Sequence, residues 1–132
     1  MDLKILEIAS DTNNNKHLDS HTHISRLKNH LCGDEIQIKL LVKEDKIIDF
    51  GYQGDSCVYC QASASLLSKI SINKKKSKIN ELCDDAKSFF DGNHKIIEKK
   101  WTNLSKIFNS KNLARKECIL LPFKTLKKIV SV

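Results

Sequence analysis

The sequence has no long apolar run. None of its 132 residues belongs to a stretch approaching the ~18 consecutive apolar residues that suggest a membrane span. The first residues, MDLK, lack the basic and then apolar build of a signal peptide. Also absent are linkers rich in Pro, Gly or Ser, internal repeats and long low-complexity tracts. These absences predict a cytoplasmic protein with no membrane partner, folded as a single domain over residues 1–132.

A chain of this length can hold a core without disulfides or metal, because a domain near this size buries roughly two-thirds of its unfolded surface. It contains five cysteines, an odd number. In a reducing compartment, cysteines more often bind metal or react than pair with one another. We therefore expect at least some of these thiols to be functional.

The net charge of +7 is unevenly distributed. Residues 1–68 carry 7 basic and 10 acidic side chains, whereas residues 69–132 carry 16 and 6. A basic pole of this kind suits nucleic acid or an acidic partner. Nucleic acid is not expected here, because no aromatic residues are interleaved to stack on bases. Lys74, Lys75, Lys76 and Lys78 are interpreted as a solvated loop.

The first half of the chain combines a short helix with strands. Apolar residues at positions 3, 5, 6 and 8 predict an amphipathic helix, followed by a loop over residues 10–22. Alternation in residues 36–40 and an apolar run in 47–52, around a turn at 43–46, predict a β-hairpin, and residues 24–27 supply a third strand. Gly33 precedes one hairpin strand and Gly54 follows the other, so the hairpin brings Cys32 and Cys57 to one end of the sheet.

Helices are expected in the second half. A helix over residues 58–70 places Cys57 at its N-terminus, where a thiolate is favoured. A second helix fits residues 81–90, with Asn80 as its N-cap and Gly92 as its stop, and a third lies within residues 95–108.

A last helix contains residues 121–130. Pro122 is tolerated there only in the first turn, which places Cys118 at or just before the helix start. The whole pattern predicts an α+β fold, in which a small antiparallel three-stranded sheet packs against several helices.

Three thiols and one carboxylate are candidates for a four-ligand site for a soft metal: Cys32, Asp34, Cys57 and Cys118. Zinc fingers bind through neighbouring pairs such as C-x-x-C, so ligands drawn from three remote segments indicate a site that the folded domain assembles. Soft sulfur ligands select zinc or an iron-sulfur cluster over magnesium or calcium.

Three segments around these residues carry a family resemblance. Residues 31–34, 54–65 and 115–120 read LCGD, GDSCVYCQASAS and RKECIL. In this order they resemble the signature blocks of the NifU/IscU-type iron-sulfur assembly proteins. The long stretch between Cys57 and Cys118 resembles the insertion of the SufU branch, and the resemblance implies the NifU/IscU N-terminal fold.

Two departures from the family pattern refine this resemblance. The family's N-terminal block has an aromatic residue and a Pro-Arg-Asn turn, which residues 9–16 lack. The IscU branch has a histidine before its last cysteine and a Leu-Pro-Pro-Val-Lys chaperone site, whereas this chain has Glu117 and the segment NLARK at 112–116. The missing histidine and the missing chaperone site both favour SufU over a scaffold that a chaperone discharges.

The resemblance implies an iron-sulfur cluster assembly protein that accepts sulfur from a cysteine desulfurase and serves iron-sulfur acceptor proteins. It binds zinc and relays sulfur, or it builds a 2Fe-2S cluster; both uses need the same four ligands. Cys32 is the persulfide acceptor by family position. Asp34 is the weaker, exchangeable ligand, and Arg115 either pairs with a freed carboxylate or thiolate or is a plain surface residue. A stand-alone enzyme is not expected.

The remaining candidates are assigned structural roles. Cys60 forms a C-x-x-C with Cys57, yet a small buried thiol beneath the site is the preferred interpretation, and Cys83 is expected in the core. Four histidines cluster in sequence and are interpreted as surface residues, although His21 with His23 has metal-binding spacing and His30 lies near Cys32; they are His17, His21, His23 and His30.

Three further side chains complete these assignments. Glu117 is either solvated or a fifth donor, and Trp101 and Phe108 are expected in the core. The alternative function is a structural zinc or basic nucleic-acid-binding module, which would bind nucleic acid in a salt-sensitive manner and ignore a desulfurase.

Overall fold

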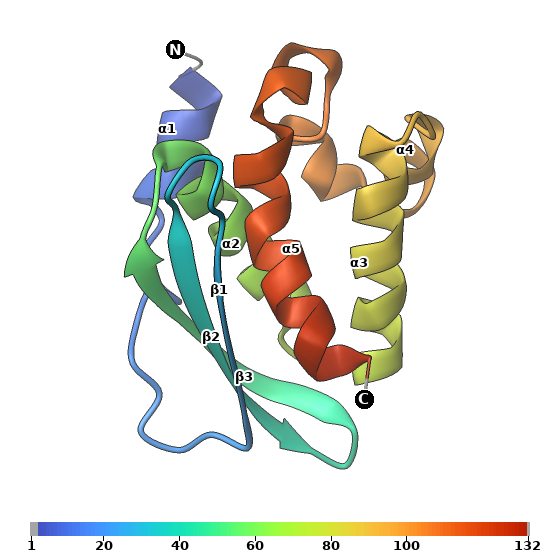
Figure 1. Cartoon of the computed structure of the whole chain (residues 1–132). Coiled ribbons are helices and arrows are strands. Elements are labelled where there is room, and N and C mark those ends of the chain that lie inside the picture. Colours follow the sequence, from blue (N-terminus) through green and yellow to red (C-terminus); the bar gives the residue numbers. More distant parts are fainter. Residues whose placement is uncertain (1–2, 132) are drawn as a thin grey trace.

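A three-stranded antiparallel sheet with helices on one face forms the framework of the computed structural model, which describes residues 3–131 (Figure 1). The strands β1 (His23–Lys28), β2 (Glu35–Lys43) and β3 (Lys46–Asp55) are neighbours in this order. Alternate residues of β2 are buried because strand side chains point to opposite faces of a sheet. The predicted hairpin, the third strand and the α+β class are therefore confirmed.

Local sequence explains the geometry of the hairpin. Glu44 and Asp45 form its two-residue turn with φ of 52° and 67°, as both central residues of a tight hairpin turn require. At the other end, Gly54 lies opposite Ile36. A Cβ on Gly54 would come within 2.1 Å of the Glu35 carbonyl oxygen, so only glycine lets β2 and β3 approach this closely.

The loop over residues 11–22 follows the outer side of β3. The backbone N–H of Tyr52 donates to the Asn14 carbonyl at 2.9 Å, and Leu18 is buried. A Cβ on Gly51 would lie 2.7 Å from the Lys16 carbonyl oxygen, so this glycine admits the loop. The loop was predicted, but its attachment to the sheet was not.

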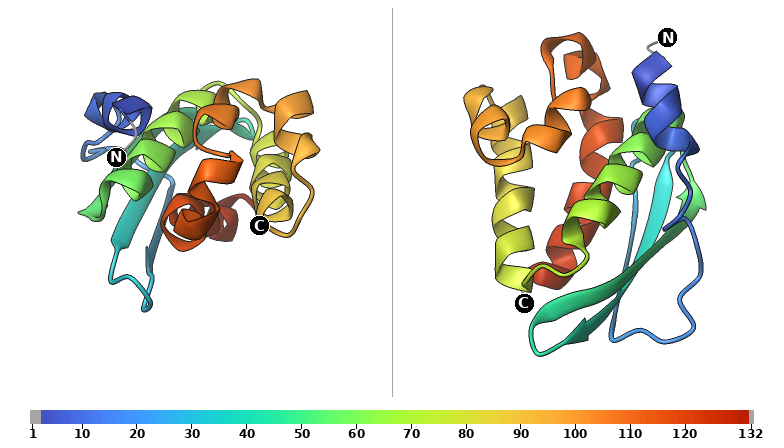
Figure 2. Two further views of the ribbon diagram at one scale, coloured as in Figure 1. Left: turned by 90° about the horizontal axis from the view of Figure 1, so that it is seen from above. Right: turned by 180° about the vertical axis from the view of Figure 1, so that it is seen from behind.

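Helices cover one face of the sheet in two tiers (Figure 2). Helix α2 (Val58–Ser71) packs against β3 and helix α5 (Lys116–Val130) packs against β1 and β2. Helix α1 (Leu3–Ser10) packs on α2, and helix α3 (Lys76–Phe90) packs on α5 from the side away from the sheet. Within residues 3–131, no helix is long and apolar enough to cross a bilayer.

Helix α3 begins earlier than predicted. It starts after Lys75, so Asn80 lies inside the helix instead of capping it, and the Asn80 side chain accepts a hydrogen bond from Lys127 at 2.6 Å. The longer helix buries Ile79, which a loop would have exposed. Lys76 and Lys78 are consequently helical, which corrects the interpretation of the lysine run as a loop. Gly92, with φ of 114°, follows the helix end as expected.

The helix expected within residues 95–108 is interrupted. Helix α4 (Lys95–Lys100) stops at Trp101, and two 3₁₀ segments follow, η1 (Thr102–Lys106) and η2 (Ser110–Arg115). Trp101 and Phe108 are buried, as predicted, and the Trp101 indole N–H donates to Asp85 at 2.8 Å. The break lets both aromatic side chains reach the core.

Helix α5 also begins earlier than predicted. Cys118 is its third residue, inside the first turn, and Pro122 is its seventh and lies in the second turn. Pro122 has no N–H to bond to the carbonyl of Cys118, four residues before it. The core tolerates this loss because the helix buries a continuous apolar face from Ile119 to Val130.

Candidate metal centre

Three of the four predicted ligands meet at one end of the sheet. Cys32 and Asp34 lie in the β1–β2 loop, and Cys118 lies in the first turn of α5 (Figure 1). One ligand atom from each of these residues lies within 4.8 Å of the others. Two thiols and a carboxylate at this separation can share one metal ion after small side-chain movements.

The β1–β2 loop is folded tightly around the first two of these residues. The backbone N–H of Asn29 donates to the Asp34 carbonyl at 2.8 Å, and the N–H of Gly33 donates to the Asn29 carbonyl at 2.8 Å. Gly33 has φ of 80°, a conformation that glycine adopts without strain. This turn fixes the positions of Cys32 and Asp34 relative to the sheet.

The Asn29 side chain extends this arrangement to α5. Its Oδ1 accepts from the Leu31 N–H at 2.8 Å, and its Nδ2 donates to Oε2 of Glu117 at 3.0 Å. Lys124 lies 3.5 Å from the same Glu117 oxygen. Glu117 therefore connects the loop to the helix immediately before Cys118, rather than pointing to the ligand group as a further donor.

Asp34 has an unusual hydrogen-bonding state. Its side chain is buried, and Oδ1 accepts from the backbone N–H of Cys57 at 3.2 Å, at the N-terminus of α2. Within residues 3–131, Oδ2 is buried and has no hydrogen-bond partner. A buried acceptor without a partner costs free energy, and a bound cation would satisfy it. The donor set therefore fits a metal ion.

Cys57 lies beside the group of three without belonging to it. It caps α2, as predicted. Burial, followed by the neighbouring thiol of Cys57, raises the pKa of Cys118 well above its ordinary value. The metal-free site thus holds its buried thiol protonated, and metal binding must displace that proton.

The three thiols of the site differ in solvent exposure. Cys32 is exposed, Cys57 is half-buried, and Cys118 is buried. A large reactant can therefore reach Cys32 most easily. This difference follows from the fold, because Cys32 lies in a projecting loop and Cys118 lies on the buried face of a helix.

Arg115 directly precedes α5 and stacks on an aromatic ring. Its guanidinium carbon lies 4.9 Å from the ring centre of Tyr59, in the first turn of α2. Such a cation–π contact joins the starts of the two helices that carry Cys57 and Cys118. Arg115 is exposed, which agrees with the surface alternative, and a role toward a freed ligand stays a prediction.

The other two cysteines are buried in the core. Burial raises the pKa of the Cys60 thiol to about 12 and that of the Cys83 thiol to about 12. Both burial predictions are confirmed. Neither belongs to the group of possible metal ligands among the described residues.

Histidines take no part in that group within residues 3–131. His17 contacts Lys39 at 3.1 Å, His23 contacts the Thr22 hydroxyl at 2.8 Å, and His21 and His30 are exposed. Desolvation by burial lowers the pKa of His23. These positions agree with the interpretation of all four as surface or edge residues.

Two residues near the centre were not predicted. Asn29 organises the loop, and Tyr59 supports Arg115. Asn29 had a sequence signal, because asparagine three residues before Cys32 is a turn-forming residue whose side chain binds nearby backbone. Tyr59 had none, since its partner is far along the chain.

Comparison with known proteins adds a family relationship. Residues 2–89 match the family described as the NifU-like N terminal domain. The chain is 36% identical over 124 residues to the iron-sulfur cluster assembly scaffold protein IscU of Thermotoga maritima, with 93% of this chain and 87% of the relative covered.

Solved structures show the same fold. An assembly scaffold assigned to the SUF system of Fervidobacterium islandicum AW-1 superposes with a TM-score of 0.80 at 26% identity, covering 97% of this chain and 94% of that one. A NifU-like N-terminal protein of Brucella abortus superposes with a TM-score of 0.78 at 18% identity, covering 98% and 91%. The second likeness concerns the fold only.

Proposed function

Because the chain belongs to the family of the NifU-like N terminal domain, we propose that it is an iron-sulfur cluster assembly protein that binds its cargo through Cys32, Asp34, Cys57 and Cys118. The observation that carries this proposal is the buried carboxylate of Asp34: its Oδ2 has no partner among the described residues, and one of its oxygens lies within 4.8 Å of the thiols of Cys32 and Cys118. The Cys57 thiol, which is near enough to Cys118 to raise its pKa, supplies the fourth ligand.

The ligand set suits a cargo that is later released. Three thiolates bind zinc or iron strongly, whereas a carboxylate is a weaker ligand for these soft sites. When the cargo leaves, Asp34 keeps one hydrogen bond, because Oδ1 accepts from the backbone N–H of Cys57 at the N-terminus of α2. We therefore assign Asp34 as the exchangeable ligand.

Sulfur enters through Cys32 in this proposal. The Cys32 thiolate attacks the outer sulfur of a persulfide on a cysteine desulfurase. A new S–S bond forms at Cys32 while the bond to the desulfurase cysteine breaks, and that cysteine leaves as a thiolate. The exposure of Cys32 supports this assignment, because the buried Cys118 cannot meet a second protein without local opening.

Arg115 acts as an electrostatic partner in the same proposal. Its charge lies over Tyr59, which is in the first turn of α2, and Arg115 directly precedes α5. When a thiolate or carboxylate leaves the metal, a nearby guanidinium can stabilise the freed anion. Zinc, when bound, would hold the thiolates ionised at neutral pH; a 2Fe-2S cluster would be cargo for iron-sulfur acceptor proteins.

The experiment that tests this function measures alanine release by a cysteine desulfurase. We expect the protein to stimulate turnover and Cys32→Ser to abolish the stimulation while circular dichroism stays unchanged. Equal stimulation by Cys32→Ser would assign sulfur acceptance to another thiol. No stimulation by the parent would reject the desulfurase partnership.

A further inference from the structure

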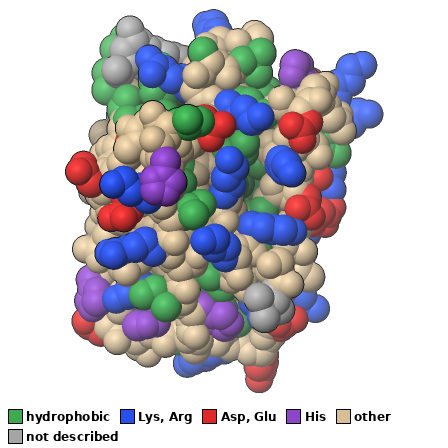
Figure 3. All heavy atoms as spheres, viewed as in Figure 1, with side chains coloured by type: hydrophobic (Ala, Val, Ile, Leu, Met, Phe, Trp, Pro, Cys, Tyr) green, Lys and Arg blue, Asp and Glu red, His purple; other side chains and the backbone are tan. Residues whose placement is uncertain are grey.

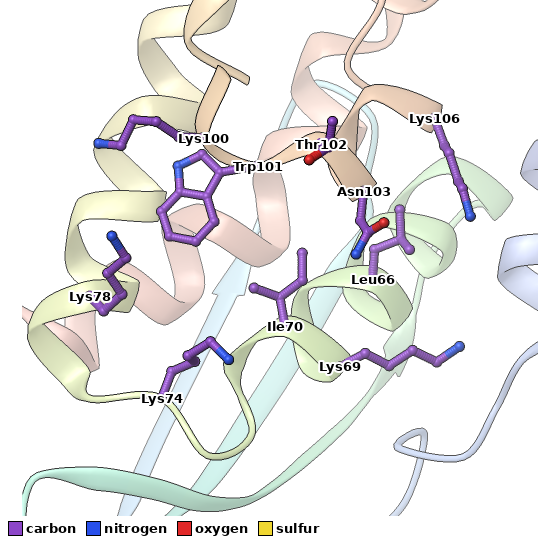
Figure 4. A pocket seen from close by; sticks show the side chains of 10 residues that line it. All are labelled: Leu66, Lys69, Ile70, Lys74, Lys78, Lys100, Trp101, Thr102, Asn103 and Lys106. Carbon is purple, nitrogen blue, oxygen red and sulfur yellow. The ribbon is translucent and has the colours of Figure 1, made fainter. Parts of the chain in front are cut away.

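A second hollow of the molecule lies away from the metal centre, between α2, α3 and the segment from Lys100 to Lys106. It has a volume of about 660 Å³. Leu66, Ile70 and Trp101 provide apolar walls (Figure 4). Five lysines from different elements point around it: Lys69, Lys74, Lys78, Lys100 and Lys106.

A neighbouring hollow of about 550 Å³ extends this one. The two share Lys74 and Lys78, and the second adds Lys46 and Lys75. We call the two hollows together the basic trough. Its seven lysines line a depression that also has apolar walls. The face that α5 presents also carries basic side chains across its middle, with acidic ones mostly toward its edges (Figure 3).

Part of the positive charge in the basic trough is neutralised by the protein itself. Lys69 pairs with Asp11, and Lys100 pairs with Glu81 and with Asp85. In contrast, four exposed lysines of the trough form no ion pair within residues 3–131: Lys46, Lys74, Lys75 and Lys106. Their charges are available to a ligand, and like charges held together in this way favour an anionic partner.

The aromatic residue of the basic trough is not free to stack on a nucleobase. Trp101 is only 7% exposed, and its indole N–H is bonded to Asp85. Lys78 Nζ lies 5.1 Å from the ring centre and occupies a ring face. Nucleic acids bound without base pairing depend on open aromatic faces, so the trough lacks what such a ligand requires.

We propose that the basic trough binds an acidic peptide segment of a protein partner. The four unpaired lysines suit several carboxylates, and the apolar walls around Leu66 and Ile70 suit an apolar side chain of that segment.

This inference does not depend on the proposed function of the metal centre. Lys69 lies twelve residues after Cys57 on the same helix, which corresponds to about 18 Å along its axis. Binding to the trough can therefore be measured on metal-free protein. If the trough does not bind the peptide, the proposal for the metal centre is unaffected. If the metal centre proposal is wrong, the proposal for the trough is unaffected.

The test uses the only tryptophan of the chain as its reporter. A short synthetic peptide of glutamates with two central leucines is titrated into the protein while Trp101 fluorescence is recorded. We expect a saturable change that weakens with added salt, since exposed charges are screened over about 10 Å at 0.1 M salt. The matching glutamine peptide should not bind. Absence of a saturable change would overturn the proposal.

Matched charge variants locate the binding. Lys74→Glu with Lys106→Glu should weaken peptide binding at least about tenfold. The control, Lys95→Glu with Lys128→Glu, changes the net charge equally at two exposed lysines outside the trough and should bind as the parent does. Equal weakening in both pairs would show a general charge effect and overturn the proposal.

Two further outcomes decide the remaining cases. If the reversed pair folds poorly, the neutral pair Lys74→Gln with Lys106→Gln replaces it and should still weaken binding severalfold; unchanged binding would count against the trough. The trough would be assigned to nucleic acid instead if a uridine oligonucleotide bound more tightly than the acidic peptide and if the same variants abolished that binding.

Discussion

Asn29 and Glu117 are joined by a hydrogen bond of 3.0 Å between Nδ2 of the amide and Oε2 of the carboxylate. Asn29 shapes the loop that carries Cys32 and Asp34, and Glu117 directly precedes Cys118. This bond therefore sets the distance between the two segments that supply ligands. It acts on the site without contacting the metal position itself.

The first prediction concerns this connection. Glu117→Ala removes the acceptor and should lower metal affinity about 10- to 100-fold, as loss of a supporting contact around a metal site commonly does. Glu117→Gln keeps an oxygen that accepts from Asn29 and should retain most of the affinity. Competition with a metal-binding dye measures both variants. Equal affinity of the alanine variant and the parent would show that the connection does not position the ligands.

The second prediction concerns Asp34. Asp34→Ala removes the exchangeable ligand while the three thiols remain, so bound metal or cluster should persist but transfer to an acceptor protein more slowly. Absorbance of the cluster during transfer to an apo-ferredoxin gives the rate. A variant that released its cluster faster than the parent would reverse the role assigned to the carboxylate.

The third prediction separates Cys60 from the working thiols. Cys60 is fully buried, so Cys60→Ala should keep metal binding and desulfurase stimulation and lose about 1 kcal/mol of unfolding free energy. Cys57→Ala, three residues earlier, should lose metal. Metal content and thermal midpoint are measured on one preparation of each variant. Loss of metal from Cys60→Ala with an unchanged midpoint would make Cys60 a ligand.

The fourth prediction concerns alkaline stability. Burial raises the pKa of Cys83 from 9.0 to about 12 in the folded protein. Above pH 9 the unfolded chain loses this proton while the folded protein keeps it, so unfolding becomes more favourable as pH rises. The stabilising effect of a neutral buried thiol is complete below pH 9 and declines toward pH 12, by at most about 1.4 kcal/mol per pH unit.

Urea titrations from pH 8 to 11 test this dependence against Cys83→Ala. The alanine variant should show a shallower decrease of unfolding free energy with pH, even if its stability is lower throughout. Cys60 should contribute a similar slope in both proteins, because its pKa is also about 12. Parallel slopes for parent and variant would contradict the assigned pKa of Cys83.

Much of the fold was predictable from local sequence. Alternation in β2 and the polar turn at Glu44 and Asp45 determine the hairpin, and the small residues after Cys57 determine α2. The starts of α3 and α5 were misplaced because tertiary burial decided them. Burial of Ile79 lets α3 begin earlier, within the lysine run. Burial of Ile119 and its neighbours lets α5 begin before the position that Pro122 alone would predict.

Three of the four predicted ligands come together in the structure: the segments that carry Cys32, Asp34 and Cys118 meet, as the family resemblance implied. The hairpin pattern predicted the approach of Cys32 and Cys57, but Cys57 lies outside this group. Cys57 lies near Cys118, which is far along the chain, and the role of Asn29 depends on the equally distant Glu117. Such long-range pairs leave no periodic signal in a single sequence.

The most direct test of the account is the metal and acid-labile sulfide content of protein purified without oxygen. We expect about one tightly held zinc, or iron with an equal amount of sulfide, per chain, because the four ligands form one site. Cys118→Ala should lose it, since removal of a buried thiolate strips a charged ligand. Iron with sulfide would identify a cluster scaffold and zinc a sulfur relay, whereas undiminished metal in both Cys57→Ala and Cys118→Ala would contradict the site.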